Sequence, residues 1–136
     1  MIDIIGIEHI AIAVNNFEES RNFFKKILGI EFLRSEKVDD QGVVTDIYNL
    51  KNGKIEFIKP QKNGSKISKF LKKHGPGLHH ICFKVKNIED SIKYLKENQI
   101  NLIGSGYSIG AEGYKVVFIH PKSTGGVLVE LAEDRI

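Results

Sequence analysis

An internal repeat is the feature of this sequence that most constrains its fold. When the chain is displaced by 71 residues, EHIAIAVNNFEESRNFFK (from Glu8) aligns without a gap with HHICFKVKNIEDSIKYLK (from His79). A repeat at a fixed offset indicates one structural unit used more than once, so the sequence predicts two copies of one unit. The identical pairs are His9/His80, Ile10/Ile81, Val14/Val85, Asn16/Asn87, Glu18/Glu89, Ser20/Ser91 and Lys25/Lys96.

Each copy begins with alternating apolar residues, which indicate a β-strand, and continues with apolar residues about 3.6 apart, which indicate an amphipathic helix. Asn15-Asn16 and Lys86-Asn87 supply turn and cap residues between the two, and Gly29 is the predicted C-cap of the first helix. Strand-like runs then follow: IEFLRSEKV, GVVTDIYNL and KIEFIKP in the first copy, and INLIGSG, YKVVFIHP and GGVLVEL in the second. The predicted unit is therefore βαβββ.

These elements predict the α+β class, with two tandem βαβββ modules that form one curved mixed sheet around a cleft and helices on the outside. At 136 residues the chain fits a single domain, residues 1–136. Repeat 1 covers about 4–60, a linker helix (ISKFLKKHG) covers about 65–76, and repeat 2 covers about 77–133.

The composition limits the kinds of molecule that this protein can bind and the cellular compartment in which we expect it. The single cysteine excludes an internal disulfide, and the apolar N-terminus is interrupted by charged residues, which argues against a signal peptide or membrane span. We therefore expect a cytoplasmic protein that binds no membrane. The net charge is +3, with the densest lysine cluster between Lys59 and Lys73. This cluster is either a solvated helix face or a basic rim for an anionic ligand; nucleic acid is excluded because no basic stripe with interleaved aromatic residues exists.

The strand pattern separates the histidines. In the first copy His9 shares a face with small alanines, and the branched residues of that strand face the helix. In the second copy His80 shares a face with Cys82, whereas its neighbour His79 aligns with Glu8 and points to the other side. We therefore expect His9 and His80 to be functional and His79 to be a bystander.

Two glutamates complete this pattern. Glu56 lies in the last strand of the first copy and Glu130 in the last strand of the second, both among apolar residues. A buried carboxylate is costly unless it is paired or binds a metal. Two histidines and two glutamates at equivalent repeat positions suit a divalent metal site with open positions for water or substrate, if all four point into one cleft.

Paired βαβββ units with these residues resemble the vicinal oxygen chelate (glyoxalase/bleomycin resistance) superfamily, and within it the methylmalonyl-CoA epimerase family. The stretches that carry the resemblance are EHIAIAV, FFKKILG, DQGV, HHICFKV and IGAEGYKVVFIHPKSTGGVLVEL. The resemblance implies that His9, Glu56, His80 and Glu130 are metal ligands. The metal would be cobalt, manganese, nickel or zinc.

The resemblance also implies an isomerase that epimerises (2R)- and (2S)-methylmalonyl-CoA by two-base proton transfer at C2 through a metal-stabilised enolate. Glu130 would be one base. The other is expected before Gln-Gly in the loop VDDQGV, which here is Asp40 where the family has glutamate. The same stretch also fits a simple polar turn.

The implied partners are a CoA-thioester substrate and a second copy of the chain in a homodimer. Two alternatives remain open at this point. One is lactoylglutathione lyase, a glyoxalase I-like isomerase with a similar ligand set. The other is a non-catalytic small-molecule-binding protein of the same fold.

Overall fold

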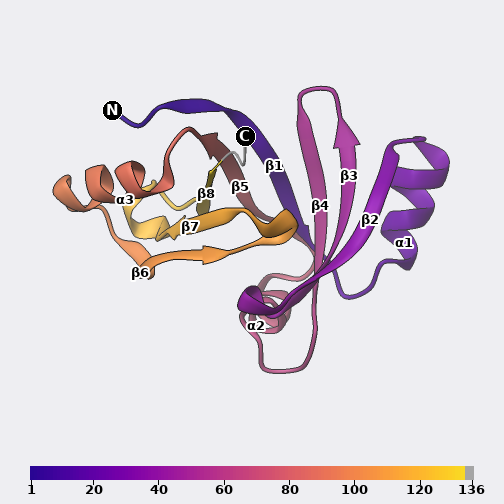
Figure 1. Cartoon of the computed structure of the whole chain (residues 1–136). Coiled ribbons are helices and arrows are strands. Elements are labelled where there is room, and N and C mark those ends of the chain that lie inside the picture. Colours follow the sequence, from indigo (N-terminus) through magenta and orange to yellow (C-terminus); the bar gives the residue numbers. More distant parts are fainter. Residues whose placement is uncertain (134–136) are drawn as a thin grey trace. The chain divides into compact units, whose positions relative to one another are not determined.

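The computed structural model of this chain describes residues 1–133 (Figure 1). Contacts within the described chain define two compact units: residues 9–79, and residues 1–8 together with residues 80–133. Both boundaries fall directly before a repeated histidine, His9 in one case and His80 in the other. The units therefore follow the repeat, but the first eight residues join the second copy. A single domain with modules at 4–60 and 77–133 stays a prediction.

The unit of residues 9–79 contains half of β1 and the first helices and strands of the chain. Its strands follow the order β2-β3-β4-β1, in which β4 and β1 are parallel and the other neighbours antiparallel. The elements are β1 (Ile4–Ala13), α1 (Glu18–Ser20), η1 (Arg21–Ile27), β2 (Glu31–Val38), η2 (Asp39–Gln41), β3 (Val43–Leu50), β4 (Gly53–Pro60) and α2 (Lys66–His74).

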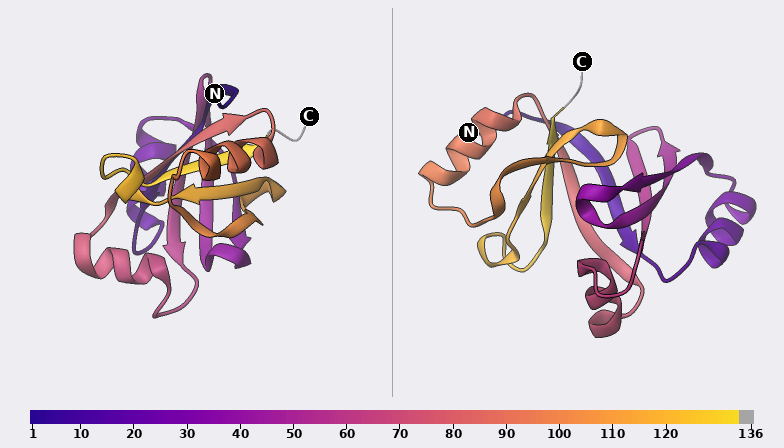
Figure 2. Two further views of the ribbon diagram at one scale, coloured as in Figure 1. Left: turned by 90° about the vertical axis from the view of Figure 1, so that its left-hand side faces the viewer. Right: turned by 60° about the horizontal axis from the view of Figure 1, so that its bottom comes forward.

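The other unit repeats this order of elements beginning with β5, and α3 lies along one side of its strands (Figure 2). Its strand order is β5-β8-β7-β6, with β5 and β8 parallel. Both copies thus have the predicted βαβββ order. The elements are β5 (Gly77–Val85), α3 (Ile88–Glu97), β6 (Leu102–Ile109), η3 (Ala111–Gly113), β7 (Lys115–Ile119), η4 (Pro121–Ser123) and β8 (Val129–Glu133).

The first helix differs from the prediction. Only one turn, Glu18–Ser20, is α-helical, and the rest is a π-helix in which the Leu28 amide donates to the Phe23 carbonyl five residues back. Leu28 is the C-cap residue, and Gly29 follows it in the left-handed conformation (φ 69°), so the predicted glycine ends the helix one position after the cap. In the second copy the Asn87 side chain caps α3 by accepting from the Asp90 amide at 2.9 Å.

The apolar core of each unit lies on the helix side of its strands. In the second copy Ile88, Ile92 and Leu95 of α3 pack with Val85 and Leu131, as the alternation predicts. The first copy has an equivalent cluster, with aromatic residues in place of most aliphatic ones. Its buried members are Phe17, Tyr48 and Phe57. The opposite side of each set of strands is left for the histidines and glutamates.

An ion pair ties the first helix to the strands. Asp46 of β3 is fully buried and accepts hydrogen bonds from Arg21 Nε at 2.7 Å, from Arg21 Nη2 at 2.9 Å and from the Ser35 hydroxyl. These hydrogen bonds raise the pKa of the Arg21 guanidinium further above its usual value. The paired cation makes the burial of the Asp46 carboxylate tolerable.

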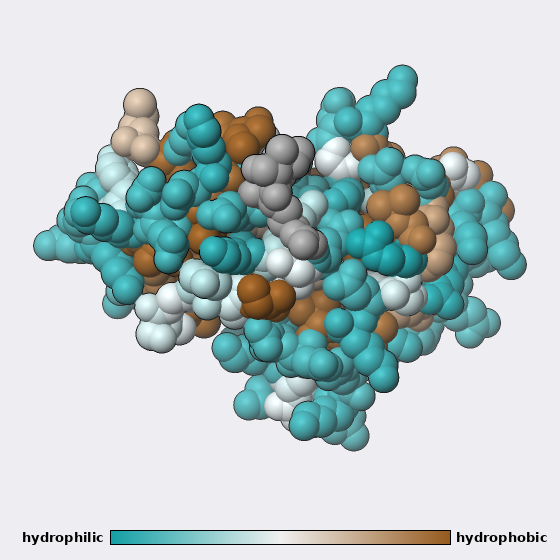
Figure 3. Space-filling model, in the orientation of Figure 1, coloured by the Kyte–Doolittle hydropathy of each residue, from teal (hydrophilic) through white to brown (hydrophobic). Residues whose placement is uncertain are grey.

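The surface carries scattered apolar side chains. On the face shown in Figure 3 they form separate patches among hydrophilic residues. Exposed isoleucines occur at both ends of the first repeat's strand–helix segment, for example Ile5 in β1 and Ile27 at the end of η1. No helix within residues 1–133 is long and apolar enough to cross a membrane.

Tyr48 holds a buried hydroxyl beside the Arg21–Asp46 ion pair. Its ring packs edge-to-face against Phe32 and Phe57, and its hydroxyl has no hydrogen-bond partner among the residues that the structure describes. Burial, followed by the nearby Asp46 carboxylate, raises the pKa of the Tyr48 phenol above 10. Because the phenol pKa is higher in the folded state than in the unfolded state, folding favours the neutral phenol. The resulting contribution to stability is fully present below the unfolded-state pKa and is lost as the pH rises through the folded-state pKa.

We expect Tyr48→Phe to keep or increase the stability at pH 7, because it removes a buried hydroxyl that costs about 1–3 kcal/mol when unpaired. Above about pH 10, where an ordinary phenol ionises, the stability of the Tyr48→Phe variant should fall less than that of the wild type. Urea unfolding at neutral pH and at two alkaline pH values measures both effects, with Tyr94→Phe as the half-exposed control. An equal loss of stability with pH in all three proteins would contradict this assignment.

Candidate functional site

The first copy brings His9 and Glu56 together on the side of the strands away from the helix. The parallel register of β1 and β4 places Ala11 beside Glu56, so His9 lies one alternation away on the same face. The distance from His9 Nδ1 to Glu56 Oε2 is 3.2 Å, and the two residues are 5% and 4% exposed. A buried imidazole and a buried carboxylate therefore form one pair.

The second copy repeats this pair with His80 and Glu130. The parallel register of β5 and β8 places Cys82 beside Glu130, in the same relation as Ala11 to Glu56. His80 Nε2 lies 3.0 Å from Glu130 Oε1, and both side chains are buried. The ring of Phe118, opposite Glu130 on β7, packs edge-to-face on the His80 ring at 5.2 Å and orients it.

The donor set of each pair fits a divalent metal. Imidazole nitrogen and carboxylate oxygen are ligands that zinc, manganese, cobalt and nickel accept. Each unit by itself supplies two such ligands from adjacent parallel strands. The four predicted ligands thus form two matched pairs, one in each unit, and their assembly into one site belongs to the function proposed below.

His79 differs from its neighbour as the alternation predicts. Its ring packs edge-to-face against Phe70 of α2 at 4.7 Å, and Phe70 in turn contacts His74 at the end of that helix. His79 therefore belongs to the packing of α2, whereas His80 faces Glu130.

Asp40 lies outside the strands that carry the His–Glu pair of its own unit. It is exposed in η2, the turn between β2 and β3. The β3–β4 register places Ile47 opposite Glu56 and Val43 opposite Pro60, so Asp40 is beyond the end of the hairpin ladder that contains Glu56. Its role as a base stays a prediction.

Two further residues with ligand atoms are buried on these strands, and the sequence pattern gives neither of them a role. Glu8, directly before His9, is 3% exposed, and Cys82 is fully buried. In the repeat Glu8 is only the counterpart of His79, and Cys82 is only a neighbour of His80 on one face. The sequence feature that could have identified both residues is a side chain with a ligand atom inside an alternating apolar strand, where such side chains are seldom buried without a partner.

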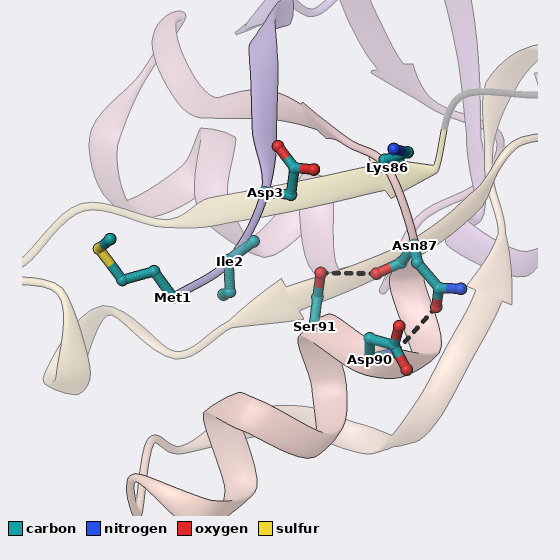
Figure 4. A pocket seen from close by; sticks show the side chains of 7 residues that line it. All are labelled: Met1, Ile2, Asp3, Lys86, Asn87, Asp90 and Ser91. Atoms are coloured by element: carbon teal, nitrogen blue, oxygen red, sulfur yellow. Dashed lines mark hydrogen bonds between the residues drawn. The ribbon is translucent and has the colours of Figure 1, made fainter.

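A surface pocket of about 180 Å³ lies elsewhere, at the start of α3 (Figure 4). None of the predicted site residues lines it. The polar groups of Asn87 and Ser91 within it are used in capping the helix, through bonds from the Asp90 amide to Asn87 Oδ1 and from the Ser91 hydroxyl to the Asn87 carbonyl. The polar side chains in this pocket therefore serve to cap α3, and we assign the pocket no ligand. Its lining is residues 1–3 with Lys86, Asn87, Asp90 and Ser91.

Comparison with known proteins identifies the family. Residues 8–118 match the family described as the glyoxalase/bleomycin resistance protein/dioxygenase superfamily. The chain belongs to this superfamily. The match spans both copies of the repeat up to β7, and it confirms the resemblance and the predicted α+β class of paired βαβββ modules.

Relatives within the superfamily are named as epimerases. The chain is 40% identical over 128 residues to methylmalonyl-CoA epimerase, mitochondrial, from Bos taurus, covering 93% of this chain and 73% of the relative. It is 40% identical over 129 residues to ethylmalonyl-CoA/methylmalonyl-CoA epimerase from Cereibacter sphaeroides, covering 93% and 96%. The crystal structure of methylmalonyl-CoA epimerase from Mycobacterium tuberculosis has a TM-score of 0.92 at 29% identity, covering 98% and 90%. These relatives are isomerases, the enzyme class that the sequence predicts.

We expect His80→Ala to weaken the binding of Mn²⁺ far more than His79→Ala. A residue that only supports a ligand costs roughly 10–100-fold in metal affinity, and loss of a ligand should exceed that range. Isothermal titration of chelator-treated protein measures the difference. His79→Ala is the matched control, since it removes the adjacent imidazole from the other side of the same strand. Equal losses in the two variants would refute the assignment of faces.

Proposed function

We propose that this chain is a metal-dependent epimerase that interconverts (2R)- and (2S)-methylmalonyl-CoA by proton transfer at C2. The observation that carries the proposal is the pair of buried His–Glu contacts at equivalent register in both copies. It is supported by about 40% identity to relatives named as epimerases of this substrate.

The proposal includes a single divalent metal ion that both His–Glu pairs bind. His9 and Glu56 would supply two ligands, and His80 and Glu130 the other two. A divalent ion held there would stabilise the negative charge that develops on the substrate's carbonyl oxygens when C2 loses its proton. Cobalt, manganese, nickel and zinc all fit imidazole and carboxylate ligands, so the donor set leaves the choice among them open.

Glu130 is the first proposed proton carrier. Its burial places the carboxylate where little water competes for protons, and the 3.0 Å contact to His80 Nε2 fixes the position of Oε1. In each direction of the reaction one carboxylate removes the C2 proton and a second group returns a proton to the opposite face. The charge of the two groups together is therefore unchanged over one turnover.

Asp40 is the second proposed proton carrier, from its place before Gln41-Gly42. Its exposure in the β2–β3 turn leaves it accessible to a substrate that binds from solvent. Proton transfer needs a heavy-atom separation of about 3 Å, so Asp40 would have to approach C2 when the substrate is bound.

The lysines of α2 are the proposed contact for the phosphates of CoA. The helix buries Ile67 and leaves all four of its lysines exposed, so positive charge gathers on one side. This charge favours a long anionic thioester over a neutral ligand. The exposed lysines of the helix are Lys66, Lys69, Lys72 and Lys73.

A second substrate of the same class is ethylmalonyl-CoA, because one relative with 96% of its length covered is named for both thioesters. Lactoylglutathione lyase and a non-catalytic binding role are the other activities to test. Cytoplasmic localisation and a homodimer also stay predictions.

We expect the metal-loaded protein to exchange the C2 hydrogen of methylmalonyl-CoA for deuterium in deuterated water, and a chelator to abolish the exchange. Glu130→Gln should slow it by about 10²–10⁴-fold, because general acid–base catalysis contributes that much. Mass spectrometry of the thioester follows the exchange. Ethylmalonyl-CoA, and methylglyoxal with glutathione, are assayed alongside. No exchange after the metal is restored would overturn the proposal.

Asp40→Asn should lower the epimerisation rate by about 10²-fold or more if Asp40 carries the second proton. Exchange from one enantiomer of the substrate should persist, because Glu130 still removes a proton from its own face. Asp39→Asn is the matched control on the same turn. Unchanged epimerisation in the Asp40→Asn variant would remove Asp40 as a base and leave the rest of the mechanism standing.

A further inference from the structure

Phe118 of β7 shares a face of the second unit with His80 and Glu130. The antiparallel register of β7 and β8 places Phe118 directly opposite Glu130, so the two side chains lie on the same side of these strands. The Phe118 ring meets the His80 ring edge-to-face, with the ring centroids 5.2 Å apart and an interplanar angle of 85°. The apolar ring therefore contacts one member of the His–Glu pair and lies across the strands from the other.

This contact restrains the orientation of the His80 ring. The χ2 angle of histidine has broad energy wells, so neighbouring groups must fix the ring. An edge-to-face arrangement is a favoured geometry for aromatic pairs, and it is lost when either ring turns. His80 is 8% exposed, so solvent offers the ring little competing interaction. With the ring in this orientation, Nε2 lies 3.0 Å from Glu130 Oε1.

The distance between these two atoms suits adjacent ligands of one metal ion. Bonds of about 2.1 Å at right angles place adjacent ligand atoms of an octahedral ion roughly 3 Å apart. His80 Nε2 and Glu130 Oε1 have this separation without any rearrangement. The second pair is therefore arranged to accept a divalent ion for as long as the ring keeps its position.

The first copy has no aromatic residue at the equivalent place. Ile47 of β3 takes the register position of Phe118 and lies opposite Glu56. His9 meets Glu56 through Nδ1 at 3.2 Å, whereas His80 meets its glutamate through Nε2. The two histidines thus present different nitrogens to their glutamates, and the exchange of isoleucine for phenylalanine accompanies this difference.

We propose that Phe118 is a positioning residue, which holds the His80 imidazole with Nε2 toward Glu130 and thereby sets the metal affinity of the second pair. The inference rests on the proposed function for the presence of a metal. It deepens that function, because it names the side chain that keeps one ligand in place. Through the same contact Phe118 also fixes the position of the Glu130 carboxylate that carries the proton.

Replacing the ring with an aliphatic side chain tests the proposal on the intact chain. In Phe118→Leu we expect the affinity for Mn²⁺, measured by isothermal titration of chelator-treated protein, to fall by about 10–100-fold, as for other groups that support a ligand. Phe118→Tyr keeps the ring and should stay within about 3-fold of the wild type. Phe118→Ile, which copies the first unit, should behave as Phe118→Leu does.

Phe83→Leu is the matched control. Phe83 lies on the opposite face of β5 from His80 and packs against the apolar core around α3. The same loss of a ring there should lower the thermal unfolding temperature and leave the Mn²⁺ affinity within about 3-fold of the wild type, because no ligand is supported from that side. Thermal unfolding of every variant shows whether the fold is kept.

Nitrogen NMR of the metal-free protein follows the ring itself. A ring held in one orientation gives one set of sharp imidazole signals, which comparison with His80→Ala assigns to His80. We expect these signals in the wild type, in Phe118→Tyr and in Phe83→Leu. In Phe118→Leu and Phe118→Ile they should broaden or double, because the ring then takes more than one orientation.

The outcomes separate this inference from the proposed function. Unchanged His80 signals and unchanged Mn²⁺ affinity in the folded Phe118→Leu or Phe118→Ile variant overturn the inference and leave the proposed metal site intact. Equal losses of affinity in Phe118→Leu and Phe83→Leu also overturn it, since they indicate lost stability and not ring position. No metal binding by the wild type overturns the proposed function, and the nitrogen signals then still decide whether Phe118 holds the His80 ring.

Discussion

The parallel register of β4 against β1, repeated by β8 against β5, is the constraint on which the candidate site depends. In each case the glutamate lies beside the residue two positions after the histidine. His80 and Glu130 are 50 residues apart in sequence, yet their side chains meet at 3.0 Å. A shift of one residue in either pairing would turn the glutamate toward the helix and its apolar core. Register alone therefore decides whether these carboxylates face a histidine or the core.

Burying the His–Glu pairs has a thermodynamic cost that the fold offsets elsewhere. Taking ionisable groups out of water is unfavourable, and an apolar pair of similar volume would often be as stable or more so. The opposite side of the same strands carries the clusters around Tyr48 and Phe57 in one unit and around Val85 and Leu131 in the other. Each strand thus places its stabilising and its chemical residues on separate faces. Because burying these histidines and glutamates adds no stability that apolar residues would not supply, their presence favours a functional role.

Much of this arrangement could be predicted from the sequence, because the repeat and the alternation are both local patterns. They were sufficient to order the strands as βαβββ and to separate His80 from His79. The π-helical bonding of η1 could not be predicted, since apolar spacing is similar for bonds to the fourth or the fifth residue. The last strand begins at Val129 rather than at Gly125, because Gly125 and Gly126 adopt positive φ in the preceding turn. The exposure of Asp40 depends on where the β3–β4 ladder ends, which only the pairing partners define.

The differences between the two copies are as informative as their likeness. Duplication gives both copies the same strand order and the same register beside each glutamate, so side chains that differ at equivalent positions are free to take separate roles. Glu8 corresponds to His79, which packs against Phe70 of α2. Ile47 corresponds to Phe118, whose ring packs against His80. A symmetric framework thus carries unequal chemistry, as an enzyme requires if it treats the two faces of one carbon with different groups.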